Sequence, residues 1–234
     1  MRRSRAVAES LLAITEIPKL KRTLKGLKRH SRATSRLRDL DVFLDDLSRS
    51  TSLEAPSVRG ALTAFLRQQT RKEHQALSSR LRQPAYHEEM KRWQHTIGSK
   101  QLSRHLSAIE PDAIRGVLHQ RLARHDAELA SLGPDSPDTD LHQLRKTVKR
   151  IRYLAELEPM EHRGLIDRLK DHQARLGDFQ DLCTQLQLLD AFAASPDAQA
   201  IPEDDATSLA TWVETLTRRK AELRKEILRL ESLV

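Results

Sequence analysis

Apolar residues recur along most of the chain with the three-to-four-residue spacing of an amphipathic helix. In the segment 139–157, for example, Leu141, Leu144, Val148 and Ile151 fall on one side of a helix at 100° per residue. No segment alternates between apolar and polar residues with the two-residue period of a half-buried strand. The pattern therefore predicts an all-α protein without a sheet.

Clusters of proline, glycine, serine and aspartate separate the periodic segments. They delimit helices at about residues 1–15, 19–47, 58–81, 84–97, 111–132, 139–157, 162–194 and 203–232. Pro111 stands in the first turn of the fifth helix and Gly133 follows its end, which is the usual order of these two residues. The clearest linker is GPDSPDTD, which follows directly and divides the chain.

Two blocks of the first half match blocks of the second half in the same order. RRSRAVAE at 2–9 aligns with KRIRYLAE at 149–156, an offset of 147 residues. LKRHSRATSRLRDLDVFLDDL at 27–47 aligns with LKDHQARLGDFQDLCTQLQLL at 169–189, an offset of 142 residues. The matches indicate an internal repeat.

The length of 234 residues allows one large domain or two small ones. Together with the internal repeat, it favours a single domain over residues 1–234. We expect the first helical repeat to occupy residues 1–133 and the second to occupy residues 134–234.

Lys and Arg outnumber Asp and Glu by 41 to 33, which gives a net charge of +8. This surplus favours a polyanionic partner such as nucleic acid, anionic lipid or polyphosphate, although it is also compatible with a charge that only keeps the protein soluble. There is no apolar run of 18 residues and no signal-peptide pattern, so we expect a cytoplasmic protein with no membrane partner.

Residues typical of catalysis or metal binding form no recognisable motif. GxxxxGK[ST], HExxH and GxSxG are absent, and the pairs His87/His95 and His119/His125 have spacings that do not suit two ligands on one helix face. The single cysteine, Cys183, stands in an apolar helical segment, where a small buried side chain is expected. We therefore predict a protein that is not an enzyme and that has no cofactor and no metal site.

Positive charge is concentrated on the polar sides of two predicted helices. Beside the apolar stripe of the segment 139–157 lie His142, Arg145, Lys146, Lys149, Arg150 and Arg152. The segment 19–47 carries a second stripe, about four turns or roughly 22 Å long, of Lys21, Lys25, Lys28, Arg32 and Arg36. Like charges four residues apart repel each other, and a bound polyanion would relieve this repulsion.

The basic helices lack the side chains that read or stack on nucleic-acid bases. Tyr153 is the only aromatic residue in the segment 139–157, none occurs between Lys21 and Arg36, and no helix-turn-helix, zinc finger or RNP-like motif is present. Lysine and arginine bind phosphate oxygens directly, and counterion release makes such binding sensitive to salt. The pattern favours a ligand that consists of phosphate groups alone.

Three segments resemble motifs of the CHAD family, the conserved histidine α-helical domain. LHQLRKTVKRIRYLAE is similar to the hallmark helix of the family, LKDHQARLGDFQDL to the segment that follows it, and SRLRDLDVFL to the counterpart in the first repeat. The resemblance covers almost the whole chain. It implies two pseudo-symmetric four-helix repeats around a basic central groove that binds inorganic polyphosphate, and an association with polyphosphate granules and their proteins.

The resemblance also implies which side chains contact the phosphate chain. From the second repeat these are His142, Arg145, Lys146, Lys149, Arg150 and Arg152, with Lys170, the repeat partner of Lys28. From the first repeat they are Arg2, Arg3, Arg5, Lys21, Lys25, Lys28 and Arg32.

With the offset of 147 residues, the first-repeat counterpart of His142 would precede Met1. We therefore expect the first hallmark helix to be truncated, either because translation starts further upstream or because half of the helix has been lost. A truncated helix would leave core surface uncovered, which predicts a marginally stable monomer or a homodimer.

Two other functions fit the basic stripes. One is non-specific nucleic-acid binding, which polyphosphate would displace at far lower phosphate equivalents if the CHAD resemblance is correct. The other is an accessory subunit that docks on an acidic partner protein, such as a polyphosphate-handling enzyme. Docking of that kind would persist after neutralisation of His142, Arg145 and Lys149.

Overall fold

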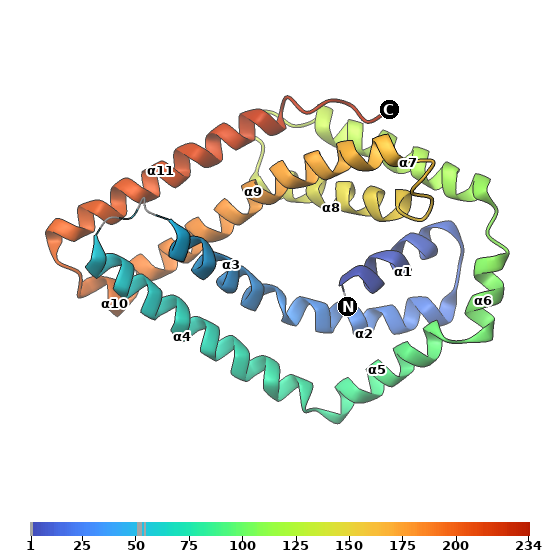
Figure 1. Ribbon diagram of the computed structural model, residues 1–234, viewed down its shortest axis with the longest axis horizontal. Helices are drawn as coiled ribbons and strands as arrows, with labels where there is room; N and C mark the ends of the chain where they lie inside the picture. The colour runs from blue at the N-terminus through green and yellow to red at the C-terminus, as the bar shows by residue number, and fades with distance from the viewer. Residues whose placement is uncertain (1, 51–52, 54) are drawn as a thin grey trace. The chain divides into compact units, whose positions relative to one another are not determined.

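The computed structural model describes residues 2–50, 53 and 55–234, and all of their side chains except those of Arg2, Arg3 and Asp204. Within these ranges every regular element is a helix and no strand is present, which confirms the predicted all-α fold (Figure 1). The helices are α1 (Arg2–Ile14), α2 (Pro18–Ala33), α3 (Ser35–Arg49), α4 (Pro56–Leu81), α5 (Pro84–Ile97), α6 (Lys100–Ser107), α7 (Pro111–Ala130), α8 (Asp138–Ala155), α9 (Arg163–Ala193), α10 (Pro196–Gln199) and α11 (Glu203–Ile227).

The sequence prediction missed the break between α2 and α3 and the short helices α6 and α10. The helix expected over 19–47 is divided at Thr34, whose φ of −95° and ψ of −2° leave the regular helical geometry. Helix α6 was not predicted. It starts after Ser99, whose hydroxyl accepts a hydrogen bond from the N–H of Leu102 at 3.2 Å, the arrangement of a helix N-cap. Leu102 is buried and holds α6 against the core.

The last helix ends earlier than the apolar pattern predicts. Helix α11 stops at Ile227, and the carboxylate of Asp126 on α7 accepts hydrogen bonds from the backbone N–H groups of Leu233 and Val234 at 2.9 and 3.1 Å. The Leu233 side chain is buried. Anchoring by Asp126 thus fixes the C-terminal tail without a helix.

The chain forms two compact units. Unit 1 contains Met1–Arg32, Leu81–Gly177 and Glu226–Val234, and unit 2 contains Ala33–Arg80 and Asp178–Lys225. The two segments of unit 2 begin at Ala33 and Asp178, which are 145 residues apart. This separation lies between the offsets of 142 and 147 residues that align the two halves of the sequence. Each unit draws on both halves of the sequence, and the division into repeats at residue 133 stays a prediction.

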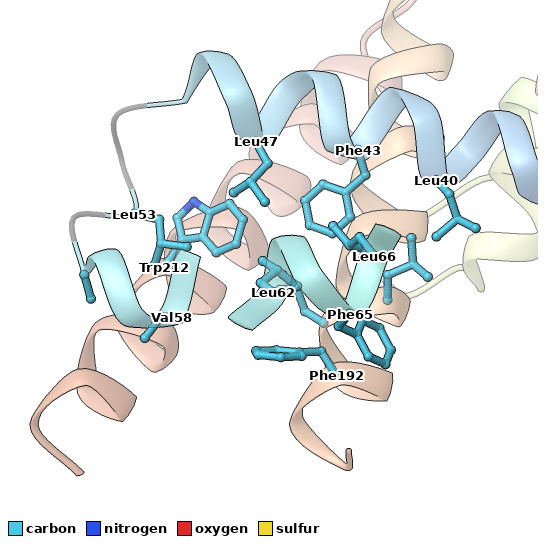
Figure 2. Close-up of a cluster of buried hydrophobic side chains, with 13 residues drawn as sticks. Leu40, Phe43, Leu47, Leu53, Val58, Leu62, Phe65, Leu66, Phe192 and Trp212 are labelled. Atoms are coloured by element: carbon cyan, nitrogen blue, oxygen red, sulfur yellow. The ribbon is translucent and has the colours of Figure 1, made fainter. Parts of the chain in front are cut away.

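Aromatic and aliphatic side chains fill the core of unit 2 (Figure 2). The rings of Phe43 and Trp212 stack with centroids 6.2 Å apart, and Phe65 and Phe192 meet at 5.5 Å. Each fully buried side chain of this kind contributes roughly 1.5–3 kcal/mol to folding. Cys183 is also buried, as predicted.

Helix α8 provides the central apolar seam of unit 1. Leu141, Leu144, Val148 and Ile151 are all at most 1% exposed, which confirms the stripe predicted for the segment 139–157. Helix α8 packs against α7 and α1. A second apolar cluster joins Leu20, Leu24 and Leu27 of α2 to other helices of unit 1. No helix in the described ranges is long and apolar enough to cross a lipid bilayer.

Candidate anion-binding cleft

A cavity of about 380 Å³ in unit 1 is lined by residues of α1, α2 and α8. We call it the basic cleft and define it by its lining residues, Arg5, Ala6, Glu9, Lys28, Arg32, Gln143, Lys146, Lys149, Arg150 and Tyr153. Six of these side chains are cationic and one is a carboxylate. The cleft therefore has a strong excess of positive charge.

The helical repeat places the cationic side chains of α8 on one face. Lys146, Lys149, Arg150 and Tyr153 follow each other at i, i+3, i+4 and i+7, so they project from the same side of the helix. The apolar seam of α8 is buried against the neighbouring helices, and this burial turns the charged face toward the cleft. On α2, Lys28 and Arg32 are one turn apart in the same way.

Glu9 of α1 lies among the cations of the cleft. Its Oε1 is 3.0 Å from Nζ of Lys28 and 3.9 Å from Nε of Arg5. Arg5 also donates a hydrogen bond from Nη1 to the Ser31 hydroxyl at 3.3 Å. One carboxylate thus contacts two of the six cationic side chains but neutralises only one positive charge. Because the ammonium group of Lys28 is partly exposed, the ion pair is weak and open to exchange for another anion.

Two arginines of α7 extend the positive surface. Arg121 and Arg124 line an adjoining cavity of about 290 Å³ that shares Glu9, Lys28 and Arg150 with the basic cleft. Nη1 of Arg121 donates a hydrogen bond to the carbonyl oxygen of Arg150 at 2.9 Å.

Burial and the nearby charge of Arg150 lower the pKa of Arg121, while Glu9 raises it. An arginine guanidinium in a protein stays protonated at neutral pH. Sequence reasoning missed both arginines of α7. Their only signal was their spacing at i, i+3 beside the apolar positions of that helix.

The predicted lysines of α2 line a third cavity, of about 480 Å³, between α1 and α2. Its lining combines Lys21, Lys25 and Lys28 with the carboxylates of Glu9 and Glu16 and with apolar residues that include Leu12 and Leu24. This cavity shares Glu9 and Lys28 with the basic cleft. The predicted residues found in the three adjoining cavities are Arg5, Lys21, Lys25, Lys28, Arg32, Lys146, Lys149 and Arg150.

Other predicted residues have different positions. His142, Arg145, Arg152 and Lys170 line none of these three cavities. Arg152 pairs with Glu156 at 3.1 Å and lies over the Tyr153 ring, 5.0 Å from its centroid. Lys170 pairs with Asp167 at 2.9 Å on an exposed face of α9. Arg2 and Arg3 belong to the backbone of α1, and their side chains lie outside the described part of the structure.

Fold and site together define an all-α protein with a cation-lined cleft. A family model described as the CHAD domain matches residues 1–190, and the chain therefore belongs to the CHAD domain family.

Two solved structures share the fold. The first is the crystal structure of the CHAD domain from the plant Ricinus communis, with a TM-score of 0.70 and 22% identity over 99% of this chain and 79% of that chain. The second is PptA from Streptomyces chartreusis, with a TM-score of 0.59 and 17% identity over 97% and 84% of the two chains. The comparison with curated proteins gave no match.

Proposed function

We propose that this CHAD domain binds inorganic polyphosphate in the basic cleft without catalysing a reaction on it. The observation that carries the proposal is the convergence of six cationic side chains, from three helices, on a cavity with a single carboxylate in its described lining. Arginine can grip phosphate oxygens with two parallel hydrogen bonds, and lysine adds mobile point charges. Such a surface fits a chain of phosphate groups.

The lining favours phosphate over nucleobases. Tyr153 is the only aromatic side chain among the described lining residues, and Arg152 covers one face of its ring. Single-stranded nucleic acids gain roughly 1–3 kcal/mol for each base that stacks on an aromatic side chain. With one partly covered ring, the basic cleft offers little of that energy, so its affinity depends on phosphate contacts.

The adjoining cavities supply a path for a longer ligand. Lys21 and Lys25 continue the positive surface beyond Lys28 on α2, and Arg121 and Arg124 continue it along α7. A polyphosphate chain that enters the basic cleft would displace Glu9 from Lys28 and pair with the released ammonium group. We therefore expect affinity to rise with chain length until the connected cavities are filled.

Two charge-matched double variants test the proposal. Arg32→Gln/Lys146→Gln removes two exposed cations of the basic cleft, and Arg71→Gln/Lys72→Gln removes two exposed cations of α4 in unit 2. Both lower the net charge by two. The affinity for long-chain polyphosphate is measured for each variant at about 0.15 M and about 0.3 M salt, beside duplex DNA and RNA.

The cleft variant should lose at least about a hundredfold in affinity, since it lacks two cations and each charged hydrogen bond contributes about 1.5–3 kcal/mol. The α4 variant should bind nearly as well as the parent protein. Polyphosphate should also displace DNA and RNA. Equal losses in both variants, or equal affinity for the three polymers, would mean that only the overall charge attracts polyanions.

In the cell the same affinity would bring the protein to polyphosphate granules and their proteins. A fluorescent fusion of the parent protein should concentrate on granules, and the Arg32→Gln/Lys146→Gln variant should remain dispersed. Granule localisation of both forms would show that something other than the basic cleft directs the protein there.

A further inference from the structure

The turn between α8 and α9 gathers one imidazole and two carboxylates. Glu158, Glu161 and His162 each present a ligand atom, and the three atoms lie within 4.8 Å of one another. All three residues belong to unit 1, and none of them lines the basic cleft. From this arrangement we infer that the α8–α9 turn is a binding site for a divalent transition-metal ion.

Burial sets these ligand atoms apart from ordinary surface acids. Oε2 of Glu158 and Nε2 of His162 are both shielded from solvent, and neither has a hydrogen-bond partner in the described ranges. Their separation of 3.8 Å is too long for a hydrogen bond. A buried carboxylate oxygen without a partner costs free energy, and a metal ion between the two atoms would satisfy both at once.

The distances suit an ion of the size of Zn²⁺. Zn²⁺ binds imidazole nitrogen at about 2.0–2.1 Å and carboxylate oxygen at about 2.0–2.2 Å. Two ligands of one tetrahedral ion therefore stand roughly 3.3–3.6 Å apart. The ligand atoms of Glu158 and His162 are slightly farther apart than that, at 3.8 Å, and Glu161 is exposed and can rotate inward.

The ligand types narrow the choice of metal. An imidazole nitrogen is a poor ligand for Mg²⁺ or Ca²⁺, which prefer oxygen, whereas Zn²⁺, Mn²⁺ and Fe²⁺ accept nitrogen with carboxylates. Three protein ligands leave a coordination position for water or another oxygen ligand. The site follows the end of α8 and precedes Arg163, the first residue of α9, so a bound ion would hold the two helix ends together.

The test uses untagged, chelator-treated full-length protein and Zn²⁺ as the probe. Calorimetric titration should give one tight site per chain, and Co²⁺ in its place should give visible absorption bands of a nitrogen- and oxygen-liganded ion. Zn²⁺ should also raise the thermal midpoint. His162→Ala and, separately, Glu161→Gln should each weaken Zn²⁺ binding by at least about tenfold and abolish the shift of the midpoint.

His74→Ala is the matched control, because His74 is an exposed histidine that also follows a glutamate. This variant should bind Zn²⁺ like the parent protein. Circular dichroism checks that the variants fold, and Glu161→Gln replaces an exposed side chain with one of the same shape. Absence of saturable binding, or binding that is unchanged in both His162→Ala and Glu161→Gln, would overturn the inference. Polyphosphate affinity plays no part in this test.

Discussion

Gly26 lies in the middle of α2, and replacing it with alanine should not give the usual gain in stability. Alanine normally stabilises a helix interior by about 1 kcal/mol relative to glycine. A Cβ at position 26, however, would lie 2.7 Å from Oε2 and 3.0 Å from Cδ of Glu89 on α5. The carboxylate would have to move.

Moving Glu89 would break contacts that join α2 to α5. Oε2 of Glu89 accepts a hydrogen bond from Nε2 of His30 at 2.6 Å, and its other oxygen pairs with Arg29. His30 is buried, so the loss leaves a buried polar group unsatisfied, at a cost of roughly 1–3 kcal/mol. The Arg29 pair is exposed and adds little. This cost offsets or exceeds the gain in helix propensity.

Gly116→Ala in α7 is the matched control, since a Cβ there meets nothing within 4 Å. Both substitutions gain the same helix propensity, so the difference between their free energies of unfolding isolates the displacement of Glu89. Urea denaturation should show Gly116→Ala more stable than the parent by up to about 1 kcal/mol, and Gly26→Ala less stable than Gly116→Ala by about 1–3 kcal/mol.

Combining Gly26→Ala with Glu89→Ala completes a double-mutant cycle. In the Glu89→Ala background the new methyl group meets no carboxylate, and Gly26→Ala should then be stabilising. If Gly26→Ala alone raises stability as much as Gly116→Ala does, the contact between α2 and Glu89 contributes nothing and the reasoning is refuted.

Three further changes should alter stability in ways that unfolding curves can check. Burial raises the pKa of Asp126, but hydrogen bonds from Ser232, Leu233, His125 and Val234 lower it to about 2. The charged Asp126 carboxylate therefore stabilises the fold fully above about pH 4, and this contribution is lost as the pH falls toward 2. Asp126→Asn should remove that acid dependence. Burial, with the nearby charge of His125, lowers the pKa of His172 to about 4. The stability of the parent protein should therefore decrease as the pH is lowered from about 6.5 to about 4, because His172 takes up a proton in the unfolded chain but not in the folded one. His172→Gln should flatten this slope. Phe192→Ala should cost about 3–5 kcal/mol, whereas truncation of the exposed Met160 should leave stability within about 0.5 kcal/mol.

Periodicity predicted most of the fold because burial in this protein follows the helical repeat. The stripe from Leu141 to Ile151 is buried as expected, and the helices around it have nearly the predicted bounds. The break at Thr34 could not be predicted in the same way. Its surroundings contain neither proline nor glycine, and the local sequence is compatible with an uninterrupted helix. Helix α6 was missed although Ser99, which follows the end of α5 by two residues, is a typical N-cap residue and starts the next helix.

Contacts between distant segments explain what the sequence could not show about the cleft. The role of Arg121 depends on the packing of α7 against α8, which brings it to the carbonyl oxygen of Arg150. The candidate metal ligands match no motif built on a pair of histidines, because the α8–α9 turn combines a single histidine with Glu158 and Glu161.

The repeat alignment was informative about local pairs but not about which side chains line a cavity. It equates Arg5 with Arg152 and Glu9 with Glu156, and both arginines do pair with the glutamate four residues later. Yet Arg5 lines the basic cleft, while Arg152 lies over Tyr153. An ion pair within one helix requires only its own spacing, which the sequence contains. Access to a cleft depends on what packs beside the helix, and that can differ between two positions that the alignment equates.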